Sequence, residues 1–370
     1  MLVIKNVEEV TPELLTSLLQ RAGILAHGKV EHIGLRANDA FNSVVTHLEV
    51  SYSPDAAPDA PAALLLKLNQ NHDGELEFLF YQSQRTAPPN ALPIVQCVDT
   101  AYDPLTGHSH CLLRDLSSTH QPPVTRYQLQ MLQGVPSERH LEQIMHALAA
   151  IHAHWWQHPE IGTADGIFAI RPWYRDYDCY QRHIARRQAE WASFSAQVGD
   201  QLSTDRHAIY TNALAALPQL WERYLAPRLL TPRQLTITHG DCYLSQFLCP
   251  KNVETGTTYL VDFDSASANF ATYDLAYLLP TFWTRSQRYE QDREQRLLGR
   301  YHQALCAHDV TDYPWETLLA DYQLMVTLMI FVPVWDQTAG SPADYWLPKL
   351  QCLTDAYEDL KCASLFTRNS

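Results

Sequence analysis

The chain places three aspartates beside two neighbouring apolar segments, "LTITHGDCYLSQFL" and "TYLVDFDSASANF". Asp241 is in the first segment, and Asp262 and Asp264 are in the second. Burying an unpaired carboxylate is costly, so such residues are usually paired, hydrogen-bonded or bound to a metal ion. The two segments therefore predict a site that uses these charges, and the rest of the chain must fold so as to support it.

Length and composition limit the class of protein. The chain has 370 residues, which is long for a single core and suits two lobes, and its 46% apolar and 18% charged residues are ordinary for a globular protein. A net charge of −14 argues against a nucleic-acid partner. No run approaches 18 consecutive apolar residues, so we expect no membrane partner. The N-terminal segment does not resemble a signal peptide, and we expect a cytoplasmic protein. Eight scattered cysteines predict reduced thiols.

The order of predicted elements indicates an α+β protein with two lobes. "KVEHIGL", "NSVVTHLEVSY" and "ALLLKLN" have the pattern of strands, "ELEFLFYQSQR" that of a helix, and 108–116 that of a further strand. "SSTHQPP" suits a hinge, and helical patterns dominate from Ser137 onward. We therefore predict a small lobe with an antiparallel sheet over 1–113, a hinge over 114–120, and a large helical lobe over 121–370.

The segment "HGDCYLSQ" has the spacing of a kinase catalytic loop. In such loops an aspartate accepts the proton of the substrate hydroxyl, and an amide five residues later holds Mg²⁺; here these are Asp241 and Gln246. Taken alone, the tripeptide is more typical of a simple turn. A histidine-rich stretch, "HAHWWQH", could suggest a zinc site, but His152 and His154 are two residues apart and do not face each other on a helix.

The "DFD" sequence can supply metal ligands. On a strand, Asp262 and Asp264 would share one face, with Phe263 buried on the other. Hard divalent cations prefer carboxylate oxygens. A strand end with two solvated acids is an equally good interpretation of this piece alone, and D-x-D also occurs in nucleotide-sugar glycosyltransferases.

One lysine, Lys67, lies at the centre of the apolar strand "ALLLKLN". A lysine on a buried strand loses its charge or finds an anionic partner, unless it reaches solvent from an edge strand. Glu77 and Glu75, in the helix that follows, are the candidate partners. Helical periodicity favours Glu77, because Phe80 and Tyr81 follow it at i+3 and i+4.

In this order, the pieces resemble the aminoglycoside phosphotransferase and choline kinase superfamily, small-molecule kinases related in fold to protein kinases. The resemblance covers Thr11 to about Asp321. It is most specific in "LTITHGDCYLSQFL" and in "YLVDFDSASANFATYDLAYLL", where Asp274 takes the family's D-L-A position, and "HALAAIHAHWW" matches a family helix.

The resemblance implies ATP and Mg²⁺ as cofactors. It implies that Lys67 binds the α- and β-phosphates, that Glu77 orients Lys67, and that adenine packs against the backbone of Leu113, Arg114 and Leu116. For catalysis it implies Asp241 as the base, Gln246 and Asp262 as metal ligands, Asp264 as a further acid often placed behind the metal ligands, and His239 and Asp274 as structural support.

The sequence departs from the family pattern at two places. The family amide is normally Asn where this chain has Gln246, although maltokinase-like relatives also use Gln after a similar "HGD". The expected phosphate loop, "GLRANDAFNSV", has only Gly34 and no G-x-G-x-x-G; Asn42 and Ser43 could hydrogen-bond phosphate there.

The sequence therefore predicts an ATP-dependent phosphotransferase that acts on a hydroxyl of a small molecule. Aminoglycoside, sugar and amino-alcohol acceptors all remain open, as does the oligomeric state. Residues that could contact the acceptor are Trp283, Arg285 and Trp335. A pseudokinase that only binds nucleotide is the first alternative, and a D-x-D glycosyltransferase, which leaves Lys67 and the "HGD" unexplained, is the second.

Overall fold

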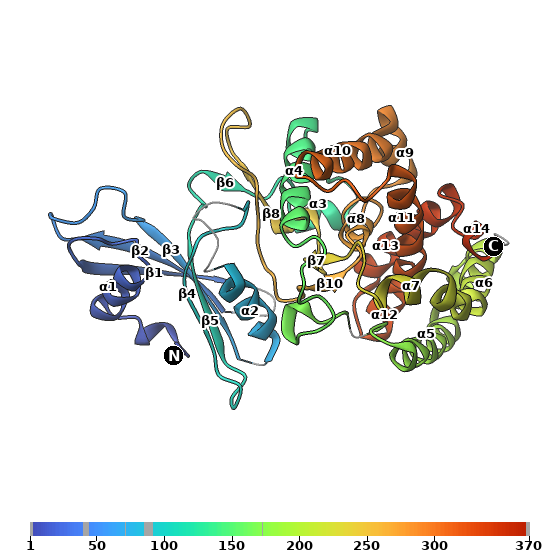
Figure 1. Cartoon of the computed structure of the whole chain (residues 1–370), viewed down its shortest axis with the longest axis horizontal. Coiled ribbons are helices and arrows are strands. Elements are labelled where there is room, and N and C mark those ends of the chain that lie inside the picture. The colour runs from blue at the N-terminus through green and yellow to red at the C-terminus, as the bar shows by residue number, and fades with distance from the viewer. Residues whose placement is uncertain (1–2, 40–43, 71, 85–91, 172, 368–370) are drawn as a thin grey trace. The chain divides into compact units, whose positions relative to one another are not determined.

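A computed structural model describes residues 3–39, 44–70, 72–84, 92–171 and 173–367. The chain divides into two compact units (Figure 1). Unit 1 comprises Met1–Gln121 together with Leu248–Ala266. Unit 2 comprises Pro122–Phe247 together with Ser267–Ser370.

Unit 1 contains an antiparallel sheet of five strands, in the spatial order β1-β2-β3-β5-β4. The strands are β1 (Val30–Asp39), β2 (Val44–Tyr52), β3 (Ala63–Asn69), β4 (Cys97–Tyr102) and β5 (Ser109–Arg114). Helix α1 (Pro12–Arg21) buries Leu15 and Leu19 in one apolar core with Leu64 and Leu66 of β3. Because side chains alternate along a strand, Lys67 lies on the opposite face of β3.

Strand β4 was not predicted, because its interior carries polar residues. Asp99 and Thr100 are both buried. Asp99 accepts hydrogen bonds from Arg21 of α1 at 2.8 Å and from His110 of β5 at 3.1 Å, and Thr100 donates to the carbonyl of His110. The polar side chains are satisfied by partners distant in sequence, and the apolar alternation that indicates a strand is lost.

Unit 2 is mainly helical. Its longer helices are α4 (Glu138–His154), α5 (Tyr177–Val198), α6 (Thr204–Leu220), α10 (Arg293–Ala307), α11 (Trp315–Met329) and α13 (Ala343–Asp359). Its shorter helices are α3 (Arg126–Gln130), α7 (Ala226–Leu229), α8 (Thr272–Leu278), α9 (Arg285–Tyr289), α12 (Val332–Thr338) and α14 (Ser364–Thr367). Strands β7 (Thr236–Thr238) and β10 (Ser267–Asn269) pair antiparallel among these helices. The predicted α+β class with an antiparallel sheet is confirmed.

The units differ from the predicted lobes in two respects. Residues 114–120 are not one linker, since Arg114 ends β5 and His120 begins β6 (His120–Gln121). Residues Leu248–Ala266, assigned from the sequence to the helical lobe, belong to unit 1. Strand β8 (Phe247–Pro250) pairs with β6, and β9 (Tyr259–Leu260) bridges to Ile94, so long-range pairing decides where this segment belongs.

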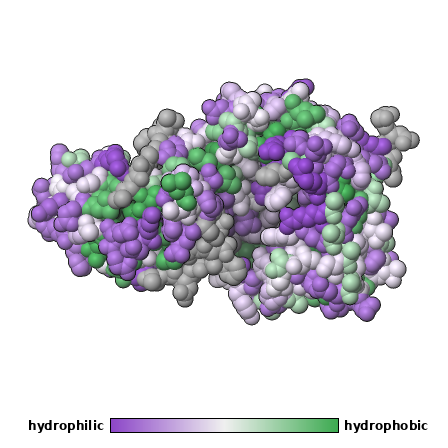
Figure 2. Space-filling model, turned by 90° about the horizontal axis from the view of Figure 1, so that it is seen from below, coloured by the Kyte–Doolittle hydropathy of each residue, from purple (hydrophilic) through white to green (hydrophobic). Residues whose placement is uncertain are grey.

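One helical stretch, Trp315–Thr338, is long and apolar enough to cross a membrane; it is the single such stretch among the residues described. It is not an unbroken apolar run, because Asp321 and Gln323 interrupt it. Of its most apolar window, 67% is buried inside the protein, as in a core helix of a globular unit. In the view of Figure 2, hydrophilic and hydrophobic residues are interspersed on the surface.

Candidate active site

Lys67 of β3, Glu77 of α2 (Glu75–Ser83) and Asp262 form a group in unit 1 that we call the lysine cluster. The Lys67 Nζ lies 2.8 Å from Glu77 Oε2, and it donates a short hydrogen bond to Asp262 Oδ1. Glu77 is fully buried and Lys67 is 9% exposed. Lys67 therefore does not extend to solvent but is held between two carboxylates. Glu75, the competing partner, lies instead within 3.4 Å of the Tyr102 hydroxyl.

The charges of the lysine cluster depend on one another. Burial alone would lower the pKa of Lys67, but the carboxylates of Glu77, Asp262 and Asp264 outweigh burial and raise it well above its ordinary value. Lys67 is therefore an ammonium ion. Burial raises the pKa of Glu77, and Lys67 only partly counteracts this. One ammonium ion, that of Lys67, thus lies among three carboxyl groups, those of Glu77, Asp262 and Asp264.

The "DFD" segment does not form the predicted strand. Strand β9 ends at Leu260, and Asp262 has a φ of 73°, in the left-handed region. Aspartate tolerates this region better than most residues. Asp262 is directed to Lys67, while Phe263 is buried and stacks on Phe80 of α2 with ring centroids 3.7 Å apart. Asp264 accepts a hydrogen bond from the Ser265 hydroxyl at 3.2 Å.

In unit 2, residues 239–241, which we call the HGD loop, leave strand β7. Asp274, in the first turn of α8, is fully buried and holds this loop. Its carboxylate accepts the backbone N–H of His239 at 2.7 Å and that of Gly240 at 2.9 Å. Gly240 has a φ of 87°, a conformation that glycine adopts without strain. The backbone before Asp241 is therefore fixed by one carboxylate.

His152, which the sequence analysis considered only as a zinc ligand, completes this arrangement. It is fully buried on α4, and its Nε2 lies 3.0 Å from Asp274 Oδ2. An ionised carboxylate only accepts, so Nε2 donates to Asp274, and Nδ1 lies 2.7 Å from the Tyr301 hydroxyl. Burial opposes ionisation of Asp274, but His152, His239 and the N–H of Gly240 outweigh it and lower the pKa of Asp274.

Asp241 and Gln246 lie in the same half-buried stretch of unit 2. The Gln246 N–H donates to the carbonyl of Tyr243 at 3.0 Å, and the Tyr243 N–H donates to the carbonyl of Asp241 at 2.9 Å. Two consecutive turns thus connect the predicted base to the predicted amide ligand. Arg171 donates to the carbonyl of Gly240 at 3.4 Å, and no pattern in the sequence predicted this contact.

The donor atoms predicted for magnesium are of the right kind. Asp262 and Asp264 carry carboxylate oxygens, and Gln246 carries an amide oxygen. Mg²⁺ prefers such oxygen ligands. Within the described parts of the chain, no three His, Cys, Asp or Glu side chains are grouped as a metal site.

The residues predicted to contact adenine belong to β5 and the turn after it. Leu113 is buried and pairs with Leu65, while the N–H of Arg114 donates to the carbonyl of Gln96. The Leu116 carbonyl accepts from the N–H of His120 at 2.8 Å. Asn42 and Ser43, predicted for phosphate, lie outside the described residues.

The predicted acceptor residues have different surroundings. Trp283 is fully buried, and its indole N–H donates to the carbonyl of Gly134 at 3.2 Å. Arg285 lies 3.1 Å from Glu358 and 2.9 Å from Asp359. Trp335 is 42% exposed on α12.

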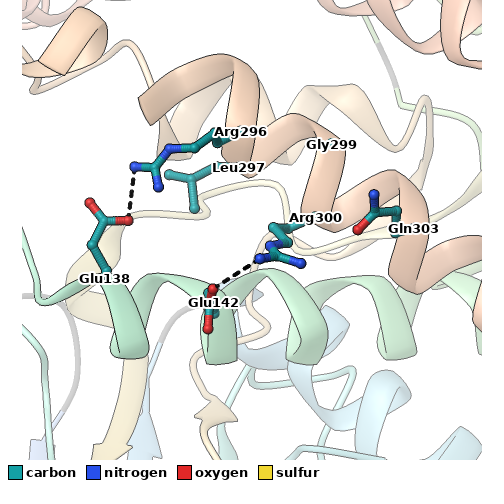
Figure 3. Close-up of a pocket in the computed structure, with 7 residues that line it drawn as sticks. All are labelled: Glu138, Glu142, Arg296, Leu297, Gly299, Arg300 and Gln303. Carbon is teal, nitrogen blue, oxygen red and sulfur yellow. Dashed lines mark hydrogen bonds and ion pairs between the residues drawn. The ribbon is translucent and has the colours of Figure 1, made fainter. Parts of the chain in front are cut away.

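A cavity of about 270 Å³ lies between α4 and α10 (Figure 3). Its charged residues pair across it: Arg296 lies 3.0 Å from Glu138, and Arg300 lies 3.5 Å from Glu142. None of the residues predicted for chemistry lines it. Its charges are satisfied within the protein, and we assign it no part in the candidate site.

Residues 84–319 match the phosphotransferase enzyme family. The match includes the HGD loop, Gln246, Asp262 and Asp274, but neither Lys67 nor Glu77. It covers more than half of the chain, and the chain belongs to this family. No curated protein matches the chain.

Among solved structures, an aminoglycoside phosphotransferase from Alicyclobacillus acidocaldarius is 13% identical, with a TM-score of 0.48, and the match covers 89% of this chain and 91% of that one. A choline/ethanolamine kinase family protein from Mesorhizobium loti is 12% identical, with a TM-score of 0.46 and 90% of each chain covered. An ethanolamine kinase from Plasmodium vivax is 10% identical, with a TM-score of 0.48, and 90% of this chain and 83% of that one are covered.

Proposed function

We propose that this member of the phosphotransferase enzyme family is an ATP-dependent kinase that transfers the γ-phosphoryl group to a hydroxyl of a small molecule. The transferred group passes through a loose transition state, so the protein contributes mainly positioning and charge neutralisation. The proposal assigns these two tasks to different residues. Charge neutralisation belongs to the lysine cluster, and positioning belongs to the HGD loop.

In the lysine cluster, we assign Lys67 to the phosphates of ATP and Glu77 to the orientation of Lys67. The 2.8 Å ion pair between them supports this assignment, because a buried ammonium held by a buried carboxylate has one defined position. We assign Mg²⁺ to Asp262 and Gln246, with Asp264 as a further acid; Gln246 lies five residues after Asp241. When bound, the ion would neutralise charge on the phosphates.

The observation that carries the proposal is the contact of Asp274 with the HGD loop. One buried carboxylate accepts the backbone N–H groups of both His239 and Gly240, immediately before Asp241. A base that must meet a hydroxyl proton needs such a fixed backbone, since proton transfer requires hydrogen-bond distance. Asp241 is therefore assigned as the group that accepts the proton of the acceptor hydroxyl.

The test is a screen of the purified full chain with Mg-ATP over hydroxylated metabolites and antibiotics, measuring ADP release and identifying the phosphate ester by ³¹P NMR. We expect at least one acceptor whose phosphorylation is lost in Asp241→Asn. ADP release that is equal in Asp241→Asn and wild type would contradict the assignment of the base. Binding of a nucleotide sugar with no binding of ATP would contradict the kinase and favour a glycosyltransferase.

A pseudokinase is the second candidate, because Gln246 replaces the usual asparagine of the catalytic loop. It predicts a magnesium-dependent thermal shift with ATP and no phosphate ester with any acceptor. The same screen, run beside thermal denaturation with Mg-ATP, separates the two candidates. Replacing Gln246 by Asn in this case would leave nucleotide binding unchanged.

A further inference from the structure

Tyr243, two residues after Asp241, is one of three aromatic residues whose rings surround the ammonium group of Lys349. The Nζ of Lys349, on α13, lies 3.7 Å from the ring centroid of Tyr345, 5.3 Å from that of Tyr243 and 5.4 Å from that of Phe282. All three distances are within the range of about 6 Å for cation–π attraction. We call Tyr243, Phe282, Tyr345 and Asp336 the cage.

The cage also supplies a counter-ion. Asp336 of α12 lies 2.8 Å from Lys349 Nζ, and the Tyr243 hydroxyl lies 3.3 Å from it. Lys349 is only 1% exposed and Asp336 only 4%. The ammonium therefore has an anion, a hydroxyl and three aromatic faces, and it fills the space that they enclose.

Such a set of groups has a known chemical preference. Aromatic rings around a carboxylate recognise alkylammonium and quaternary ammonium ions. Here the preference is met from within the chain, because a lysine side chain occupies the position that a ligand cation would take. Tyr243 belongs to the stretch that follows the HGD loop, and its N–H donates to the carbonyl of Asp241 at 2.9 Å, so the backbone joins the occupied cage to the proposed base.

We propose that Lys349 acts as a built-in occupant of this cage and excludes quaternary ammonium acceptors from the region beside Asp241. The inference rests on the proposed kinase function, and it narrows the acceptor. Choline-like amino alcohols are excluded, because the cage that would receive their cation is already filled and its carboxylate is already paired with Lys349. The acceptor instead presents a neutral or anionic portion to this side of the catalytic loop.

The test uses tetramethylammonium as a probe and needs no phosphoryl transfer. Lys349→Ala removes the stem and the charge while leaving the three rings and Asp336, so thermal denaturation should show stabilisation by tetramethylammonium chloride relative to equal NaCl. We expect the variant to bind the probe at least about tenfold more tightly than wild type does. Lys349→Met is the matched control: it loses the charge but still fills the cage, and it should not respond.

Removing one partner of a buried ion pair is strongly destabilising. If Lys349→Ala is largely unfolded, the readout becomes the folded fraction recovered by tetramethylammonium, measured by circular dichroism. A folded Lys349→Ala that ignores the probe, an unfolded one that the probe does not rescue, or a wild type that binds it equally well would each overturn the proposal. Phosphorylation of choline by the wild type would overturn it while leaving the kinase function intact; absence of any kinase activity would leave the binding result standing.

Discussion

The lysine cluster and the HGD loop both hold charged groups away from water, but by different means. In the lysine cluster, one ammonium is shared by Glu77 and Asp262, and Asp262 is also a proposed metal ligand. In the HGD loop, the carboxylate of Asp274 accepts two backbone N–H groups and the ring N–H of His152, which have no other role in the proposed chemistry. The first arrangement can exchange a protein contact of Lys67 or Asp262 for a contact with a ligand. In the second, every one of these contacts joins two groups of the protein.

This difference suits the two tasks assigned to the regions. A cation that must bind phosphates has to release at least part of its attachment to protein carboxylates, and Lys67 has one partner fixed on a helix and one on an irregular segment. A proton acceptor gains from a backbone that does not move, because a displacement of about 1 Å in a catalytic geometry can cost roughly 10²-fold in rate. Substitutions in the two regions should therefore impair the enzyme in different ways.

Asp241→Asn is expected to have the largest effect on activity. The amide cannot accept the acceptor's proton as a carboxylate does, and general-base catalysis typically contributes about 10²–10⁴-fold. We expect kcat to fall by that factor while Mg-ATP binding, measured by calorimetry, stays near that of wild type. A variant that retains most of the wild-type rate would show that Asp241 is not the base.

Asp274→Asn should damage both rate and stability. An amide offers one acceptor oxygen and an NH₂ group to a site with three donors, and hydrogen bonds to charged groups contribute about 1.5–3 kcal/mol. We expect a loss of that size in urea unfolding and a fall in kcat of roughly 10²-fold. Unchanged unfolding of Asp274→Asn would mean that the loop is held by other contacts.

The same variant gives a pH test. The pKa of Asp274 is lowered in the folded protein, so its carboxylate stabilises the fold above the ordinary carboxyl pKa of about 3.9, and this contribution is lost as the pH falls below that value. The difference in unfolding free energy between wild type and Asp274→Asn should be constant from pH 7 to 5 and shrink toward pH 3. A difference that grows on acidification would contradict the lowered pKa.

How far the sequence predicted these two regions depends on how local their determinants are. The strand with Lys67 and the helix with Glu77 follow from alternation and helical spacing, which are local, and the sequence analysis selected Glu77 over Glu75 on that basis. The left-handed Asp262, the contacts of His152 and the pairing of Lys349 with Asp336 depend on partners far along the chain. No periodicity in the sequence encodes such partners.

Lys67 and Glu77 should behave as a coupled pair. Lys67→Met should raise the KM for ATP and lower kcat, and Glu77→Gln should have part of the same effect by loosening Lys67. Residues in one ion pair are non-additive by roughly 0.5–3 kcal/mol in a double-mutant cycle. Glu75→Gln, which changes the neighbouring acid outside the cluster, is the matched control and should be additive with Lys67→Met. Strict additivity for Glu77 would mean that it does not orient the lysine in the working enzyme.

Gln246 should give the smallest effect, and it tests the metal ligand that we propose beyond the HGD loop. Its amide oxygen can serve Mg²⁺ as that of Asn does, but its side chain is one methylene longer. If the loop is adapted to this length, Gln246→Asn should draw the oxygen away from the coordination distance of about 2.0–2.1 Å and raise the magnesium concentration needed for activity, and Gln246→Ala should raise it further. The measurement is kcat against Mg²⁺ concentration for the three forms.

Because Asp262 is the proposed ligand from the lysine cluster, Asp262→Ala should shift the same curve in the same direction and also weaken Mg-ATP binding. A Gln246→Ala enzyme with unaltered magnesium dependence would show that Gln246 is not a metal ligand.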